Sequence, residues 1–412
     1  MRVYVLSVSS SRLKVALAEF TPPELSAQDG PELGLPDDRP AAQAPDVQLA
    51  LTLTRTEFPT EGELLGGTGL DLERALACLQ QTVADWPRPD AVVTLAQWEG
   101  PPAASHGATR SQVIRIEPEQ LALAEQDLPT GAVLGIRGLR LAIAWAQQLH
   151  VPLLTVPLPQ STELPAEARE TGIPGLRSEP RFHVLNSEMA ARDAAFNVGK
   201  RFSEAAVVAA YLGSTSSVTA YQGGRPVSST GSGLSGGPLG MRQAGPVSPA
   251  TLQQLWDGGE QHWPPHHSWT EFWSGEGGLR ALTGYGTVHE LITAEGTDAR
   301  VQAAAATLAY QVACAVGQQV GALTVRPDAI VLVGPLARWS SVMDRLEARL
   351  SWMAPVFVVP GDPEFEAVAH AAGRALMGWA TVTAWPPGAD AAPDKLPTPL
   401  PIPAPAEGTD TR

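Results

Sequence analysis

The feature that most constrains the fold is a long helical pattern followed by a short, wholly apolar strand. Residues 298–323 repeat apolar side chains at helical spacing on one face, namely Val301, Leu308, Val312, Val316 and Val320. Thr297 or Asp298 is the candidate N-cap. Residues 329–333 are all apolar and stop at Gly334, which is typical of a strand buried in a sheet covered on both faces. This order predicts an α/β fold with a ligand beyond the end of that strand.

The same alternation of strands and helices extends along most of the chain. Two groups of elements emerge, and 412 residues are enough for two domains that each bury a core. We predict one domain from residues 1–157 plus 364–384, and a second from residues 158–363. Residues 21–46 are predicted to form a mobile loop within the first domain, and residues 385–412 a disordered, proline-rich tail.

Composition excludes several classes of function. The net charge of -15 opposes binding to nucleic acid or to anionic membranes, and no apolar run reaches the roughly 18 residues of a membrane span. We therefore expect a cytoplasmic protein with no nucleic-acid or membrane partner. Cys78 and Cys314 lie in helical patterns and are predicted to pack in the core. His262, His266 and His267 are interleaved with prolines and a tryptophan, which favours a surface loop over a metal site.

Serine and glycine gather in turns that follow predicted strands. One turn spans residues 9–11, another spans residues 213–217, and the dense run 228–245 is predicted to be a loop at a binding site. Small residues let backbone N–H groups approach phosphates closely. The alternative is that these turns only connect strands.

Four segments, taken in order, resemble the butyrate kinase branch of the acetate kinase group, which belongs to the superfamily of sugar kinases, actin and the heat-shock ATPases. Their similarity covers roughly residues 180–378, and the opening hairpin extends it more weakly. The segments are Phe182-His183-Val184-Leu185-Asn186 through Lys200, residues 207–238, Ala309-Tyr310-Gln311 leading to Gly334, and Ala354-Pro355-Val356 through Ala367.

The resemblance implies two ribonuclease H-like (actin-like ATPase) domains around a nucleotide cleft. It implies ATP and Mg²⁺ as cofactors, a small carboxylate as substrate, and a possible homodimer. His183 and Arg242 would be the catalytic residues, and Glu364 or Glu366 would support the metal. The implied nucleotide and phosphate contacts are Ser9, Ser10, Ser11, Gly213, Ser214, Thr215, Ser217, Gly237, Gly334, Leu336 and Ala337.

Two of these residues have a purely structural alternative. Glu364 would be an ordinary acidic residue in the first turn of a helix, where the helix dipole favours it. His183 would be a structural histidine that leads into a helix.

The chain departs from the family pattern at polar positions that phosphoryl transfer would use. Groups that neutralise a transferring phosphoryl supply several kcal/mol of transition-state stabilisation, so their loss bears directly on turnover. Arg242 is one residue from the place where the family has its arginine. The departures are Ser7, Ser9, Leu95, Val133, Pro157, Tyr211, Ser228, Leu234, Gly236, the pair Arg242-Gln243, and Leu291.

Three hypotheses follow. The first is a butyrate kinase-like carboxylate kinase that transfers the γ-phosphoryl of ATP to a short or branched acid, with Leu95 and Val133 enlarging the acceptor pocket. The second is a catalytically impaired paralogue that acts as a binding or regulatory protein. The third is a kinase or hydrolase for a different acceptor, because one fold hosts several chemistries.

Overall fold

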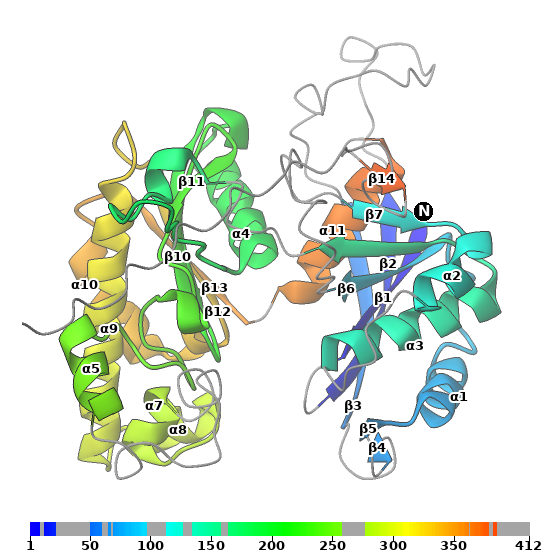
Figure 1. Cartoon of the computed structure of the whole chain (residues 1–412), viewed down its shortest axis with the longest axis horizontal. Helices are drawn as coiled ribbons and strands as arrows, with labels where there is room; N and C mark the ends of the chain where they lie inside the picture. Colours follow the sequence, from blue (N-terminus) through cyan, green and yellow to red (C-terminus); the bar gives the residue numbers. More distant parts are fainter. Residues whose placement is uncertain are drawn as a thin grey trace, which may run out of the picture.

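The computed structural model describes most of the chain as two α/β lobes (Figure 1). The described residues are 1–8, 12–21, 50–59, 65–66, 69–96, 113–126, 134–157, 164–257, 277–361, 363–378 and 382–384. The predicted tail 385–412, the three clustered histidines and nearly all of the predicted loop 21–46 lie outside these residues.

The first lobe is built on a mixed seven-stranded sheet, counted over the described residues, in the order β14-β7-β8-β6-β1-β2-β3. β1, β6 and β8 run parallel, whereas β2 and β3 continue from β1 as antiparallel hairpins. Helices α1, α2 and α3 cover one face, and α11 covers the other. The elements are β1 (Arg2–Val8), β2 (Arg12–Thr21), β3 (Ala50–Pro59), β6 (Ala91–Ala96), β7 (Val113–Ile116), β8 (Leu153–Pro157), β14 (Val382–Ala384), α1 (Leu72–Thr82), α2 (Leu121–Gln126), α3 (Leu134–Leu149), α11 (Glu364–Leu376) and the short pair β4 (Leu65–Gly66) and β5 (Gly69–Leu70).

The second lobe is built on a five-stranded sheet, again within the described ranges, in the order β11-β10-β9-β12-β13. β9, β12 and β13 are parallel, and β10 and β11 add to β9 as an antiparallel meander. Helices α7 to α10 pack on one face and α4 on the other. The elements are β9 (Ala206–Leu212), β10 (Ser216–Gln222), β11 (Arg225–Ser229), β12 (Ala329–Gly334), β13 (Val356–Pro360), α4 (Val184–Asn197), α5 (Pro249–Asp257), α7 (Gly278–Thr283), α8 (Val288–Ala294), α9 (Ala299–Val320) and α10 (Ser340–Leu350).

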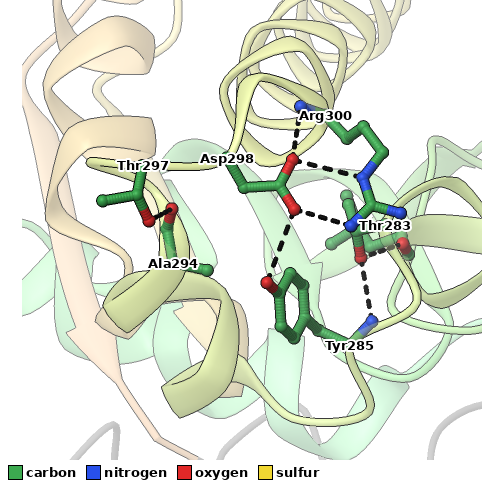
Figure 2. Close-up of polar contacts among 7 residues, drawn as sticks. Thr283, Tyr285, Ala294, Thr297, Asp298 and Arg300 are labelled. Atoms are coloured by element: carbon green, nitrogen blue, oxygen red, sulfur yellow. Dashed lines mark hydrogen bonds and ion pairs between the residues drawn. The ribbon is translucent and has the colours of Figure 1, made fainter.

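The long helix predicted near residues 298–323 and the apolar strand predicted at residues 329–333 are both present, as α9 and β12. Val301, Leu308, Val312 and Val316 are fully buried on one face of α9, and every residue of β12 is buried. Asp298 is the N-cap of α9, and its carboxylate accepts hydrogen bonds from the backbone and the side chain of Arg300 and from the hydroxyl of Tyr285 (Figure 2). The hydrogen bond from the Arg300 side chain is the largest cause that lowers the pKa of Asp298 to about 2.

The last described elements return to the first sheet, since α11 packs on it and β14 pairs with β7. We keep the predicted division, 1–157 plus 364–384 against 158–363, as a proposal for the domain boundaries. One expectation is wrong: Cys314 is exposed on α9 instead of packing in the core, because it lies off the buried stripe of that helix. Cys78 is only partly buried. Over the described residues, no helix combines the length and apolarity needed to cross a membrane.

Candidate functional site

The carboxyl ends of three parallel strands meet at one edge of the second sheet. Gly334 ends β12 at a φ of 117°, and a Cβ placed there would lie 2.4 Å from the carbonyl oxygen of Leu212, the last residue of β9. Only glycine tolerates that backbone conformation and that approach. The N–H of Gly361, just after β13, donates to the carbonyl of Gly334 at 3.0 Å. This edge is where open α/β sheets bind ligands.

The turn between β9 and β10 presents backbone donors at the same edge. The carbonyl groups of Gly213 and Ser214 accept hydrogen bonds from the N–H groups of Met241 (2.8 Å) and Arg242 (2.9 Å). The N–H groups of Gly213, Ser214 and Thr215 have no acceptor among the residues that the structure describes. With its carbonyls engaged and its amides available, this turn suits an anion such as a phosphate.

His183 lies beside this turn as the N-cap of α4. Its Nδ1 is hydrogen-bonded to the hydroxyl of Ser217 (3.0 Å) and its Nε2 to the hydroxyl of Thr215 (3.1 Å). Its ring stacks on Tyr211 of β9 with the ring centroids 4.0 Å apart. Burial lowers the pKa of His183 to about 4, so the ring is neutral at physiological pH. A neutral imidazole donates one hydrogen bond and accepts one, which fixes complementary roles for the two hydroxyl groups.

The other predicted phosphate contacts occupy different environments. Gly237, at a φ of 96°, lies against the turn region, because a Cβ there would be 2.4 Å from the carbonyl oxygen of Ser216. Leu336 and Ala337 follow Gly334 in a short 3₁₀ helix, but both side chains are buried in the second core, which leaves only their backbone for a ligand. Ser9, Ser10 and Ser11 lie outside the described residues.

The two candidate metal carboxylates differ in their partners. Glu364, in the first turn of α11, accepts a hydrogen bond from the hydroxyl of Ser7 at the end of β1 (2.5 Å). Glu366 forms an ion pair with Arg55 of β3, while its Oε2 is buried without a hydrogen-bond partner in the described structure. Glu364 contacts Ser7 near the end of β1, and Gly361 lies just after β13. Because Glu364 follows Gly361 by only three residues, a reach of about 10 Å, the carboxyl ends of β1 and β13 lie near each other.

Ser7 and Glu364 provide hard oxygen atoms, which suit Mg²⁺ when phosphates and water complete the coordination. Within the described ranges, no group of three or more His, Cys, Asp or Glu residues could hold a metal by itself. One carboxylate with a neighbouring hydroxyl fits Mg²⁺, which proteins commonly bind through one or two carboxylates together with substrate phosphates.

Two cations at this position were missed by the sequence analysis. Lys14 pairs with Ser7 across the β1–β2 hairpin, and its ammonium nitrogen lies 5.9 Å from the ring centroid of Phe365. Arg55 lies 5.8 Å from the same centroid. The available signal for Lys14 was a lysine between the apolar residues Leu13 and Val15 of a predicted strand, but the Phe365 ring beside it comes from α11, more than 300 residues later in the chain.

Arg242 is exposed, and its guanidinium has no partner within the described part of the chain.

Leu95, at the position of an expected arginine, lies in an apolar environment. It packs against the cluster that contains Phe365 and Val368, as does Leu185 of α4. Leu291, at the position of another expected arginine, is fully buried in the second core. The structure thus unites His183 with Thr215 and Ser217, and Gly334 with the turn, but it removes Leu291 from any direct role.

Comparison with solved structures defines the class of fold. The chain is similar to an acetate kinase from Porphyromonas gingivalis, with a TM-score of 0.64 and 17% identity over 91% of this chain and 99% of that one. It is similar to a propionate kinase from Francisella tularensis, with a TM-score of 0.61 and 15% identity over 90% of this chain and 98% of that one. The fold is that of the acetate kinase group, two actin-like ATPase domains, as predicted.

Sequence comparison identifies the family. A probable butyrate kinase from Deinococcus radiodurans is 41% identical over 349 residues, which cover 82% of this chain and 86% of that protein. The chain belongs to the butyrate kinase family. No family model matches the sequence.

Proposed function

We propose that the protein is a butyrate kinase-like carboxylate kinase, which converts ATP and a short or branched-chain carboxylate into an acyl phosphate and ADP. A carboxylate oxygen attacks the γ-phosphorus, and the bond from that phosphorus to the bridging oxygen of ADP breaks. The observation that carries the proposal is the 41% identity to a probable butyrate kinase across most of both chains. For such a transfer the protein mainly positions the reactants and neutralises charge.

The β9–β10 turn supports the phosphate side of this proposal. The amides of Gly213, Ser214 and Thr215 would meet phosphate oxygens, and the exposed Arg242 would add a positive charge beside them, because its backbone is tied to Ser214. His183 is neutral, so its contribution would be to orient the hydroxyls of Thr215 and Ser217 rather than to supply charge.

Glu364, oriented by Ser7, is the residue that we propose to support Mg²⁺. The ion would neutralise negative charge on the phosphates when it is bound with the nucleotide. Glu366 is already committed to Arg55, so its proposed contribution is to hold the start of α11 in place.

Leu95 and Leu185 have apolar surroundings. These surroundings favour an acceptor carboxylate that carries an alkyl chain over one that the protein would bind through its charge alone. Lys14, whose ammonium group lies 5.9 Å from the ring centroid of Phe365, could balance the acceptor carboxylate, since Arg55 is already paired with Glu366. We also propose that the protein works in the cytoplasm and forms a homodimer, as the family resemblance implies.

The test is to incubate the purified chain with ATP, Mg²⁺ and hydroxylamine, together with acetate, butyrate or isobutyrate, and to measure acyl hydroxamate. Hydroxamate that depends on ATP and on the acid supports the proposal. A folded chain that binds ATP but yields no hydroxamate with any acid would instead be the impaired, binding paralogue.

Arg242→Ala tests the proposed phosphate contact. Removing one charge that neutralises the transferring phosphoryl should lower kcat about 100-fold or more. Arg280→Ala is the matched control, since Arg280 is another exposed arginine nearby, whose N–H donates to the carbonyl of Met241. Equal rates for the two variants would contradict the role proposed for Arg242.

A further inference from the structure

Gln243 is a fully buried polar side chain beside the β9–β10 turn. Its Oε1 accepts hydrogen bonds from the N–H groups of Ser216 (3.0 Å) and Gly233 (2.8 Å). Its Nε2 donates to the carbonyls of Gly236 (2.8 Å) and Pro238 (2.9 Å), with a longer contact to the carbonyl of Ser216 (3.3 Å). One carboxamide therefore satisfies five backbone groups that would otherwise be buried without partners.

These contacts determine the orientation of the amide. If oxygen and nitrogen were exchanged, the oxygen would face three carbonyls and the nitrogen two N–H groups, so every contact would be repulsive. A carboxamide matches this set because it offers donors on one side and an acceptor on the other. An apolar residue would leave all five groups unpaired, and a carboxylate would lack the donors.

The five groups belong to two segments that form the proposed phosphate site. Ser216 begins β10 immediately after the turn 213–215, whereas Gly233, Gly236 and Pro238 belong to the glycine-rich loop after β11. A Cβ placed on Gly237 would lie 2.9 Å from Nε2 of Gln243, so the backbone of the loop lies directly against the amide. Gln243 joins the loop to the turn.

The backbone next to Gln243 completes the same connection. The carbonyl of Gln243 accepts from the N–H of Gly240 at 3.1 Å, which closes a short turn over residues 240–243. Within it, Met241 and Arg242 donate to the carbonyls of Gly213 and Ser214. Gln243 is buried and the neighbouring Arg242 is exposed. The contacts of Gln243 therefore fix the position on the surface from which the Arg242 side chain extends into solvent.

We propose that Gln243 is a positioning residue for the nucleotide phosphates, whose carboxamide holds the 213–215 turn, the 233–238 loop and the backbone of Arg242 in one arrangement. This inference rests on the proposed function. Gln243 does not touch the ligand itself, because its side chain is enclosed and its polar groups are already used.

Gln243→Leu removes all five hydrogen bonds while keeping a similar volume. A displacement of about 1 Å in such a site costs about 100-fold, so kcat/KM for ATP should fall by roughly that factor. The KM for the carboxylate should stay within about twofold, because that substrate does not use the turn. Hydrogen exchange should become faster at the N–H groups of Ser216 and Gly233, which donate to the carboxamide, and at those of Met241 and Arg242, which donate to the turn.

Gln243→Glu is the second variant, and it keeps the shape. A carboxylate there would face the carbonyls of Gly236 and Pro238, so burial and these carbonyls should raise its pKa. The protonated acid can still donate to one carbonyl. Its kcat/KM for ATP, relative to that of the wild type, should therefore be highest at low pH and decline as pH rises. This ratio gives a result even if Gln243→Leu fails to fold.

Gln319→Leu is the matched control. Gln319 is a buried glutamine of α9 in the same lobe, but its Oε1 has no hydrogen-bond partner in the described structure. That variant should keep wild-type kinetics for both substrates.

Three results would overturn the inference. The first is a folded Gln243→Leu protein with wild-type kcat/KM for ATP, which would leave the proposed function intact. The second is an equal change in both substrate constants, with no pH effect for Gln243→Glu, which would mean that Gln243 only stabilises the fold. The third is a wild-type chain that neither binds ATP nor forms hydroxamate, which would overturn the proposed function as well.

Discussion

The neutral state of His183 makes a quantitative prediction for stability against pH. Burial lowers the pKa of His183 from 6.5 to about 4, so the folded protein resists protonation of this ring. Above pH 6.5 both the folded and the unfolded chain carry a neutral ring, and His183 adds no pH dependence. As pH falls through 6.5 the unfolded chain takes up the proton first, so stability decreases until the folded form also protonates near pH 4.

The size of the effect follows from these two values. A difference of about 2.5 pKa units corresponds to about 3.4 kcal/mol in total. Between pH 7.5 and pH 5.0, where most of the unfolded but little of the folded chain is protonated, about 2 kcal/mol should be lost. This loss is a large part of the free energy of unfolding of most domains, which is roughly 5–15 kcal/mol.

The assay compares urea unfolding of the wild type and of His183→Gln at pH 7.5, 6.5, 5.5 and 5.0. Glutamine keeps one donor and one acceptor but does not ionise, so the variant should lack the additional loss of about 2 kcal/mol. His289→Gln, at an exposed position of α8, is the control and should follow the wild type. If wild type and His183→Gln lose the same free energy between pH 7.5 and 5.0, the ring is not held neutral and the reasoning is wrong.

Three further predictions concern a strand end, the proposed metal site and a carboxylate at the end of α8. Gly334→Ala should destabilise the protein by about 2 kcal/mol or more in thermal or urea unfolding, whereas Gly317→Ala, inside α9 with only Met353 at 3.9 Å, should be stabilising. Glu364→Gln should raise the Mg²⁺ concentration needed for half-maximal hydroxamate formation about tenfold or more, and an unchanged Mg²⁺ curve would contradict its proposed role. Glu295→Ala should cost about 1–3 kcal/mol in unfolding, because it removes the carboxylate that accepts from the indole N–H of the buried Trp339 (2.7 Å) and from the hydroxyl of Ser341.

Features set by near neighbours were predictable from the sequence. The buried stripe of α9, the Asp298 cap and the apolar strand β12 depend on spacing over a few residues, and all three are present. The family resemblance assigned the turn 213–217 and Gly334 to one phosphate site, which stays a prediction; in the structure a Cβ at Gly334 would meet the carbonyl oxygen of Leu212, the residue just before that turn. The resemblance carried the fold class, which comparison with solved structures bears out.

Features set by distant neighbours were not predictable. Ser7 and Glu364 are 357 positions apart, and their hydrogen bond exists only because α11 returns to the first sheet. Cys314 lies in an alanine-rich helix that looked buried, yet it faces solvent because the partners of α9 cover only one side.

The sequence by itself determined the order of elements, the buried faces and the small residues at the strand ends, because local spacing sets helix and strand periods. Tertiary structure alone decided that Gln243 would be enclosed, that His183 would be neutral and that Leu291 would join the core. Burial and charge state depend on which surfaces the folded chain brings together, and no short stretch of residues encodes that by itself.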